Sequence, residues 1–243
     1  MQILRTAQEL STYLKNTDCK PGCFADTSFL YGVAYRDDRF FESANDILDL
    51  LSENLIPLYA NVISRMEFVD LILRKQITEG CVTMFNEIER ERNGSKLFNL
   101  LKNIRDRHTA GHRENQSYKI GETQLKNLRR LVSTYSPGFT WKEFCHKYTG
   151  ALLVSEWKMI EEELGLNFVE ILEDATSELF KEPLLWADMV QVMGMNGMRG
   201  PDAMIVNLFL KSNFQLLITG DSDFEDCLRD SGKSSADKAV LIL

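Results

Sequence analysis

The sequence predicts an α/β protein: a central parallel sheet flanked by helices, with a helical insertion. Short apolar runs alternate with helix-period segments near both ends of the chain. Two of these runs, LLIT and VLIL, are apolar at almost every position, which is typical of strands buried on both faces. The middle of the chain has helix-period segments only. Strands that alternate with helices form parallel sheets, so we expect the two end regions to build one core.

The expected core comprises residues 21–80 and 165–243, and residues 1–20 form a helical extension before it. Five apolar runs are predicted strands: 22–25, 55–60, 167–172, 214–220 and 239–243. The predicted core helices lie around 41–51, 61–75, 173–180, 184–193 and 201–212.

The expected insertion is residues 81–164. Its helix-period segments are 82–93, 95–108, 123–135 and 140–164. Small and turn-forming residues at Ala110–His112 and Ser136–Gly138 predict breaks between helices.

The composition excludes several classes of protein. The 243 residues are 44% hydrophobic and 26% charged, as in globular proteins rather than disordered or fibrous ones. No apolar run approaches the roughly 20 residues that a membrane span needs. The first residues lack the apolar core of a signal peptide, and the five cysteines form no CxxC pair. We therefore expect a cytoplasmic protein with no membrane partner.

The charge is unevenly distributed along the chain. The net charge is -8, yet residues 86–150 hold 13 Lys and Arg against 7 Asp and Glu, a balance of +6. The other residues carry 15 basic against 29 acidic side chains, a balance of -14. A basic segment can contact phosphates, although a solvated helical surface explains the same pattern.

Acidic residues follow two of the predicted strands. Asp26 comes directly after residues 22–25, and Asp221 follows residues 214–220, with Asp223 two positions later. Parallel strands bring their carboxyl ends to one edge of the sheet, where open α/β folds bind ligands. The alternatives are a helix cap for Asp26 and a turn for Asp221 and Asp223.

Two further acids lie on predicted helices. Asp202 falls in the first turn of an apolar helix, after Pro201. Glu67 lies in a helix with apolar neighbours on most sides, where an unpaired carboxylate is costly. The alternatives are a favourable helix-dipole interaction for Asp202 and a capping box between Ser64 and Glu67.

Together these acids suggest a metal site. Carboxylate oxygens without Cys or His suit hard cations such as Mg²⁺ or Mn²⁺. Such ions generate hydroxide and stabilise the oxygens of phosphodiester hydrolysis.

The same segments resemble the four acidic motifs of the PIN-domain nucleases, in the order of that family. The matching segments are FADTSFL, ISRMEFVDLI, GMRGPDAMIVN and ITGDSDF. The resemblance implies a PIN-like fold and a metal-dependent endoribonuclease. It assigns metal binding and catalysis to Asp26, Glu67, Asp202 and Asp221, with Asp223 as an additional metal ligand. Ser28 and Thr219 become polar neighbours of the substrate.

RNA is the expected partner, and the insertion is the expected RNA-binding arm. Its candidate phosphate contacts are Arg105, Arg107, Arg113, Arg129 and Arg130, with Tyr118 and Tyr135 available for base stacking. Other functions stay open: a catalytically weak module that binds RNA or protein, a structure-specific DNA nuclease, a homodimer interface, or a surface for a cognate inhibitor protein.

A zinc site is disfavoured. His108 and His112 have the i, i+4 spacing of zinc ligands, but Gly111 predicts a break in the helix that would align them. Cys145 and His146 are adjacent, which is not usual ligand spacing. A GxxxxGK[ST] phosphate loop is absent from the sequence, so nucleoside triphosphate hydrolysis is not expected.

Overall fold

The chain forms two compact units. The computed structural model describes residues 1–88, 95–114, 116–135, 139–164, 167–169, 179–229 and 237–243. The first unit comprises residues 1–36, 40–68 and 165–243, and the second comprises residues 37–39 and 69–164. The division falls inside one long helix, α4 (Val62–Ile88), so it comes earlier than residue 81, where the sequence placed it.

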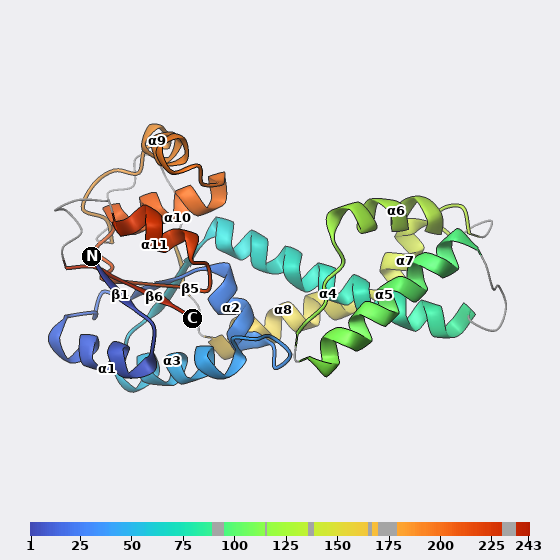
Figure 1. Ribbon diagram of the computed structural model, residues 1–243, viewed down its shortest axis with the longest axis horizontal. Coiled ribbons are helices and arrows are strands. Elements are labelled where there is room, and N and C mark those ends of the chain that lie inside the picture. The colour runs from blue at the N-terminus through green and yellow to red at the C-terminus, as the bar shows by residue number, and fades with distance from the viewer. Residues whose placement is uncertain (89–94, 115, 136–138, 165–166, 170–178, 230–236) are drawn as a thin grey trace. The chain divides into compact units, whose positions relative to one another are not determined.

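The first unit contains a parallel sheet. Six strands of the described chain form it, in the order β1-β6-β5-β2-β3-β4, and every neighbouring pair is parallel (Figure 1). The strands are β1 (Gln2–Leu4), β2 (Cys23–Ala25), β3 (Leu58–Asn61), β4 (Asn167–Val169), β5 (Leu216–Thr219) and β6 (Ala239–Ile242). Every residue of β2, β5 and β6 is buried, as their apolar sequences predict.

Helices cover the sheet on both faces. They are α1 (Ala7–Asn16), α2 (Thr27–Ala34), α3 (Phe41–Glu53), α9 (Trp186–Asn196), α10 (Gly200–Lys211) and α11 (Asp223–Arg229). Helices α1 and α3 lie on one face and α10 and α11 on the other (Figure 1). Helix α10 is apolar along most of its length, and Ile205, Leu208 and Phe209 pack with strand residues in one core cluster. The expected α/β architecture is therefore confirmed for this unit.

The order of the strands reverses between β2 and β5. From β2 the chain passes to β3 and β4 on one side, whereas β5 and β6 lie on the other side. Open α/β folds bind ligands at the carboxyl ends of the strands beside such a reversal, here the ends of β2 and β5. The strand order alone therefore predicts which edge of the sheet binds a ligand.

The first 20 residues are not purely helical, which corrects our expectation. They contain helix α1, whose start is fixed by a capping box between Thr6 and Glu9. They also contain β1, which pairs with β6 at the edge of the sheet. Three residues are too few to show a hydrophobic period, so no sequence pattern indicates this strand.

Helix α4 is longer than predicted. The sequence suggested one helix ending at residue 75 and another starting at residue 82, but α4 is continuous over 27 residues. Gly80, within the expected break, lies against Tyr148, where an added Cβ would come 2.7 Å from the tyrosine Cβ. The glycine therefore permits close packing rather than ending the helix.

The second unit is helical, as expected. Besides most of α4 it contains α5 (Lys96–Arg113), α6 (Glu122–Val132), α7 (Trp141–Tyr148) and α8 (Gly150–Leu164). Its core packs residues of α4 to α7, among them Phe85, Leu101, Leu128 and Phe144.

The predicted break at Ala110–His112 is wrong. Helix α5 continues through Gly111 to Arg113. The segment that follows packs against the helix at Gly111, and the backbone N–H of Gln116 donates to the carbonyl of Gly111. An added Cβ at Gly111 would lie 2.3 Å from the carbonyl oxygen of Gln116. The structure instead divides the predicted helix 140–164 at Thr149, between α7 and α8.

Two predictions fall outside the described residues: the break at Ser136–Gly138 and most of the helix at 173–180. Of the latter, only residues 179 and 180 are described, and Phe180 forms an isolated bridge with Ser212. In the described parts of the chain, no helix combines the length and apolar character that crossing a membrane requires.

Candidate functional site

Asp26 and Asp221 follow the carboxyl ends of the neighbouring strands β2 and β5. Ala25, the last residue of β2, is in register with Ile218 of β5. The backbone N–H of Asp26 continues this pairing by donating to the carbonyl of Ile218 at 2.9 Å. Strand β5 ends at Thr219, two residues before Asp221. The position of both acids at one carboxyl edge, predicted from the strand ends, is confirmed.

Asp26 is buried and held by two hydroxyl groups. Its side chain is the N-cap of α2 by position but makes no cap hydrogen bond, so capping does not explain it. Instead the hydroxyls of Ser28 and Thr219 donate to Asp26 Oδ2, at 2.8 and 3.0 Å. Burial raises the pKa of Asp26, and the hydrogen bond from Ser28 and further donors oppose that rise.

The same two hydroxyl groups hold the loop that carries Asp221. Ser28 Oγ accepts from the backbone N–H of Gly220 at 2.7 Å, and Thr219 Oγ1 accepts from the N–H of Asp221 at 3.0 Å. Asp221 Oδ1 accepts from the N–H of Asp223, which makes a local turn and begins α11. Ser28 and Thr219 thus connect the two acidic segments, while Asp223 itself is exposed.

Glu67 is connected to Asp26 through Thr27. The hydroxyl of Thr27 lies 3.1 Å from Glu67 Oε2 and 3.3 Å from the carbonyl of Ser64. The capping box proposed for Ser64 and Glu67 is wrong, because α4 begins at Val62 and its cap is Asn61. The side-chain oxygen of Asn61 accepts from the backbone N–H of Ser64 at 2.7 Å.

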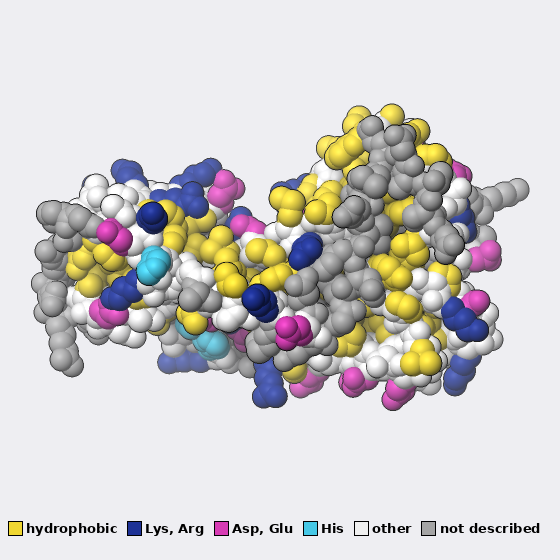
Figure 2. All heavy atoms as spheres, turned by 180° about the vertical axis from the view of Figure 1, so that it is seen from behind, with side chains coloured by type: hydrophobic (Ala, Val, Ile, Leu, Met, Phe, Trp, Pro, Cys, Tyr) yellow, Lys and Arg dark blue, Asp and Glu magenta, His cyan; other side chains and the backbone are white. Residues whose placement is uncertain are grey.

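Asp202 lies in the first turn of α10, with Pro201 at the start of that helix. Helix α9 ends at Gly197, whose φ of 67° is the left-handed conformation that glycine adopts readily, and three residues later α10 begins. Met189 of α9 packs against Met204 of α10, so the two helices hold this turn. Figure 2 shows apolar side chains on the outside of this region, where Trp186, Val190 and Met195 are exposed.

The four predicted acids interact electrostatically. Burial and, after it, the charges of Asp26, Glu67 and Asp221 together raise the pKa of Asp202 to about 6, against a smaller opposite effect of Arg199. A favourable helix dipole lowers the pKa of an acid. A stabilising helix dipole is therefore outweighed as an explanation of Asp202. The charges of the other three predicted acids all act on this residue.

The site fits a hard cation by its chemistry but has no preformed metal cage. The side chains offer carboxylate oxygens, which Mg²⁺ and Mn²⁺ prefer, and their mutual repulsion favours a cation. However, no group of three or more His, Cys, Asp or Glu residues in the described chain is arranged to hold an ion. Coordination by several of these acids therefore requires side-chain movement.

The sequence analysis missed two features of this edge. Asn61 ends β3 as Asp26 follows β2, and its buried Nδ2 has no hydrogen-bond partner among the described residues. The strand-end rule would have found it. Phe40 packs over Gly220, where an added Cβ would lie 2.6 Å from the ring. No sequence pattern indicates that long-range contact.

The five predicted arginines lie in the second unit, whereas the four predicted acids lie in the first. Arg105 pairs with Asp106 at 2.7 Å and lies over the ring of Phe85, so part of its guanidinium is already engaged. Arg107, Arg113, Arg129 and Arg130 are exposed. Arg129 lies over Trp141, and Arg107 lies over Tyr118. Tyr118 and Tyr135 are half-buried and pack against the core of the unit.

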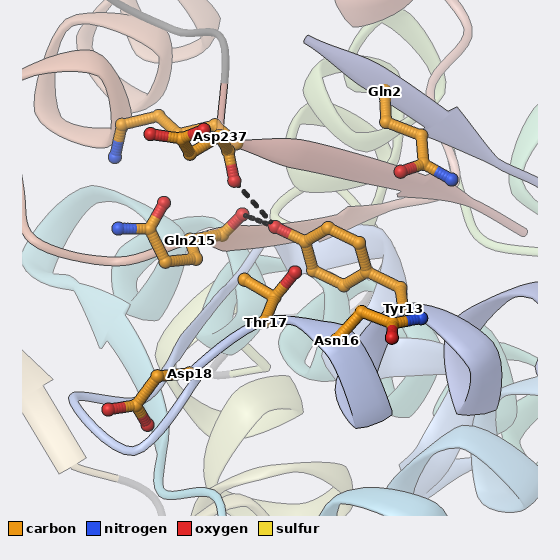
Figure 3. A pocket seen from close by; sticks show the side chains of 8 residues that line it. Gln2, Tyr13, Asn16, Thr17, Asp18, Gln215 and Asp237 are labelled. Atoms are coloured by element: carbon orange, nitrogen blue, oxygen red, sulfur yellow. Dashed lines mark hydrogen bonds between the residues drawn. The ribbon is translucent and has the colours of Figure 1, made fainter.

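A cavity of about 430 Å³ lies at the opposite edge of the sheet (Figure 3). Gln2, Gln215 and Asp237, at or before the amino ends of β1, β5 and β6, line it. The hydroxyl of Tyr13 lies 3.0 Å from the carbonyl of Gln215 and 2.8 Å from that of Asp237. Ligands of open α/β folds bind at carboxyl ends, so this cavity is separate from the acidic site.

Comparisons of the chain with family models, with curated proteins and with solved structures found no match. The interpretation of the acidic site therefore depends on its geometry and chemistry.

Proposed function

We propose that this protein is a PIN-like, metal-dependent endoribonuclease. The observation that carries the proposal is that the charges of Asp26, Glu67 and Asp221 all act on Asp202, with Asp26 and Asp221 at the carboxyl ends of two neighbouring strands. Four carboxylates in one field, with a pKa near 6 for Asp202, are costly for folding alone. Such a cost is expected at sites where perturbed acids have a function.

Asp26, Glu67, Asp202 and Asp221 would hold Mg²⁺ or Mn²⁺, with Asp223 at the periphery. A bound ion of this kind lowers the pKa of water and stabilises charge on phosphodiester oxygens. The side chains of the protein provide the position and charge of the site. Asp26 is buried and fixed by two hydroxyl groups, whereas Asp202 and Asp221 are only half-buried.

Ser28 and Thr219 act as positioning residues in this proposal. Each hydroxyl donates to Asp26 and accepts from the backbone of the loop at 220–221. Their hydrogen-bonding capacity is thus used within the protein, which favours orientation of Asp26 and Asp221 over direct contact with substrate.

RNA is the proposed substrate because of the sequence resemblance and the basic segment at residues 86–150. An acidic first unit repels a polyanion, so binding requires positive charge from elsewhere in the chain. The exposed arginines of the second unit provide it.

Cleavage assays with Asp26→Asn and Asp221→Asn test the proposal. A panel of single-stranded and structured RNAs is incubated with wild type in Mn²⁺, Mg²⁺ or EDTA. We expect cleavage with either ion and none with EDTA, and each variant should lose cleavage while keeping its fold. Asparagine still accepts the hydroxyl hydrogen bonds of Asp26 but weakens metal binding. Asp18→Asn is the matched control, because this exposed acid lies beside the cavity at the amino edge.

The alternatives give different results. RNA binding without cleavage in any metal would favour a binding module. Cleavage of branched DNA in preference to RNA would favour a structure-specific DNA nuclease. Full activity of Asp26→Asn would remove this residue from the mechanism, and loss of its folded circular dichroism spectrum would indicate a structural role.

A further inference from the structure

Two imidazole rings face each other on helix α5. Because α5 continues through Gly111, His108 and His112 lie one turn apart on the same face. Their Nε2 atoms are 3.1 Å apart, and the ring planes are nearly perpendicular, at 83°. A metal site here is disfavoured by sequence on the expectation of a helix break at Gly111, and that expectation is wrong.

The spacing of the two nitrogens is close to that of two ligands on one ion. Imidazole nitrogens bind Zn²⁺ at about 2.0–2.1 Å, and two ligands at tetrahedral angles are then roughly 3.3–3.4 Å apart. A small rotation of either side chain provides this spacing. The backbone of the helix already fixes the rest of the geometry, so little order must be gained on binding.

Two acidic side chains act on His108. The charges of Glu79 and Asp37, both within the second unit, act on His108 in the direction that favours positive charge, against a smaller opposite effect of Lys75. Glu79 itself pairs with Lys75 at 2.7 Å. Burial and the neighbouring His112 lower the pKa of His108, the direction that favours the neutral ring that binds metals.

We propose that His108 and His112 form a binding site for a divalent transition metal such as Zn²⁺ or Ni²⁺. Imidazole suits these ions, whereas Mg²⁺ prefers oxygen. No third His, Cys, Asp or Glu of the described chain completes the site, so water or a partner's group fills the remaining positions. The site is chemically distinct from the acidic edge, and it does not depend on the nuclease proposal.

Calorimetric titration of the untagged full-length protein with Ni²⁺, after removal of metals with EDTA, tests this site. We expect one Ni²⁺ to bind per chain. His108→Gln and His112→Gln should each weaken binding at least about tenfold, because losing even an outer-shell partner typically costs about 10- to 100-fold in metal affinity. Glutamine is a better helix former than histidine, so both variants should stay folded. His146→Gln, at the exposed third histidine, is the control and should bind as wild type does.

Binding at the acidic edge is separated by repeating the titration with Asp26→Asn and with excess Mg²⁺. The histidine-dependent binding should persist in both cases. The proposal is overturned if Ni²⁺ affinity is the same in wild type and both histidine variants, or if wild type shows no binding up to millimolar Ni²⁺. In the latter case the two rings form only a hydrogen bond with each other.

Discussion

At the scale of single residues, substitution of Asp202 measures the repulsion between its carboxylate and those of the other predicted acids. We expect Asp202→Asn to raise the melting temperature of the metal-free protein near pH 8, by roughly 2 °C or less because solvent screens a half-exposed carboxyl group. The difference should decrease below pH 6 and vanish near pH 4. Above pH 6 the folded wild type carries the cost of an ionised Asp202; below its ordinary pKa of 3.8 the carboxyl is neutral in both states.

Thermal unfolding in EDTA at several pH values measures this effect. Adding Mn²⁺ should reverse the order, since wild type gains stability from a bound ion that the variant holds less well. A gain of equal size at pH 8 and pH 4 would contradict the charge explanation and indicate altered packing.

The residues of the site differ in how far sequence reasoning reaches them. Asp26 and Asp221 follow apolar strands, and that position alone predicts the sheet edge. Glu67 and Asp202 are indicated less directly, by acids on apolar helices, and the family resemblance strengthens a prediction that capping and dipole interactions also explain. The hydrogen bond from the Thr219 hydroxyl to Asp26 joins residues 193 positions apart, and only the folded chain reveals it.

At the scale of helices, two glycines should respond in opposite ways to the same substitution. Gly194 of α9 has nothing within 4 Å of an added Cβ, so Gly194→Ala should stabilise the protein by about 0.5–1 kcal/mol through helix propensity. A Cβ added at Gly111 of α5 would lie 2.3 Å from the carbonyl oxygen of Gln116. Gly111→Ala should therefore destabilise it by about 1–3 kcal/mol, the usual cost of overpacking.

Urea unfolding followed by circular dichroism compares the two variants under identical conditions. Stabilisation by both would show that the segment after α5 moves aside without cost. These glycines also explain why the helix boundaries were predicted poorly. A glycine within a helical pattern indicates either a break or a close contact, and the sequence alone does not distinguish the two.

At the scale of the whole molecule, the separation of charge predicts a salt effect. If the second unit binds RNA, Arg129→Ala combined with Arg130→Ala should weaken binding and reduce the log-log salt slope by about 0.7 per lost contact on single-stranded RNA. Binding is measured by fluorescence anisotropy across a series of salt concentrations. Lys15→Ala with Lys20→Ala is the matched control, because these exposed residues lie in the acidic first unit.

Light scattering on the same samples tests the other interpretation of the basic surface. If the arginine variants keep the salt slope of wild type but change molecular mass, the segment is an oligomerisation surface. If the arginine variants lose both the salt slope and the molecular mass of wild type, RNA binding requires the oligomer.

The overall architecture was largely predictable, because burial on both faces leaves a strong mark on strands. All five expected strands are found, and the insertion is helical. The position of the unit boundary was not predictable to the same degree. Helix α4 continues across this boundary, between residues 68 and 69. The sequence pattern there stays helical, so it does not mark where packing passes from one unit to the other.

The short strands at the two ends of the sheet have a consequence for solubility. Strands β1 and β4 have three residues each, so either edge exposes few unpaired backbone groups on which another chain could assemble. Strand β6, with the sequence AVLI, is the neighbour of β1 in the sheet. Without β1 this apolar strand would itself be an edge, and such segments promote aggregation. The pairing of Gln2–Leu4 with β6 thus protects the sheet from growing into intermolecular assemblies.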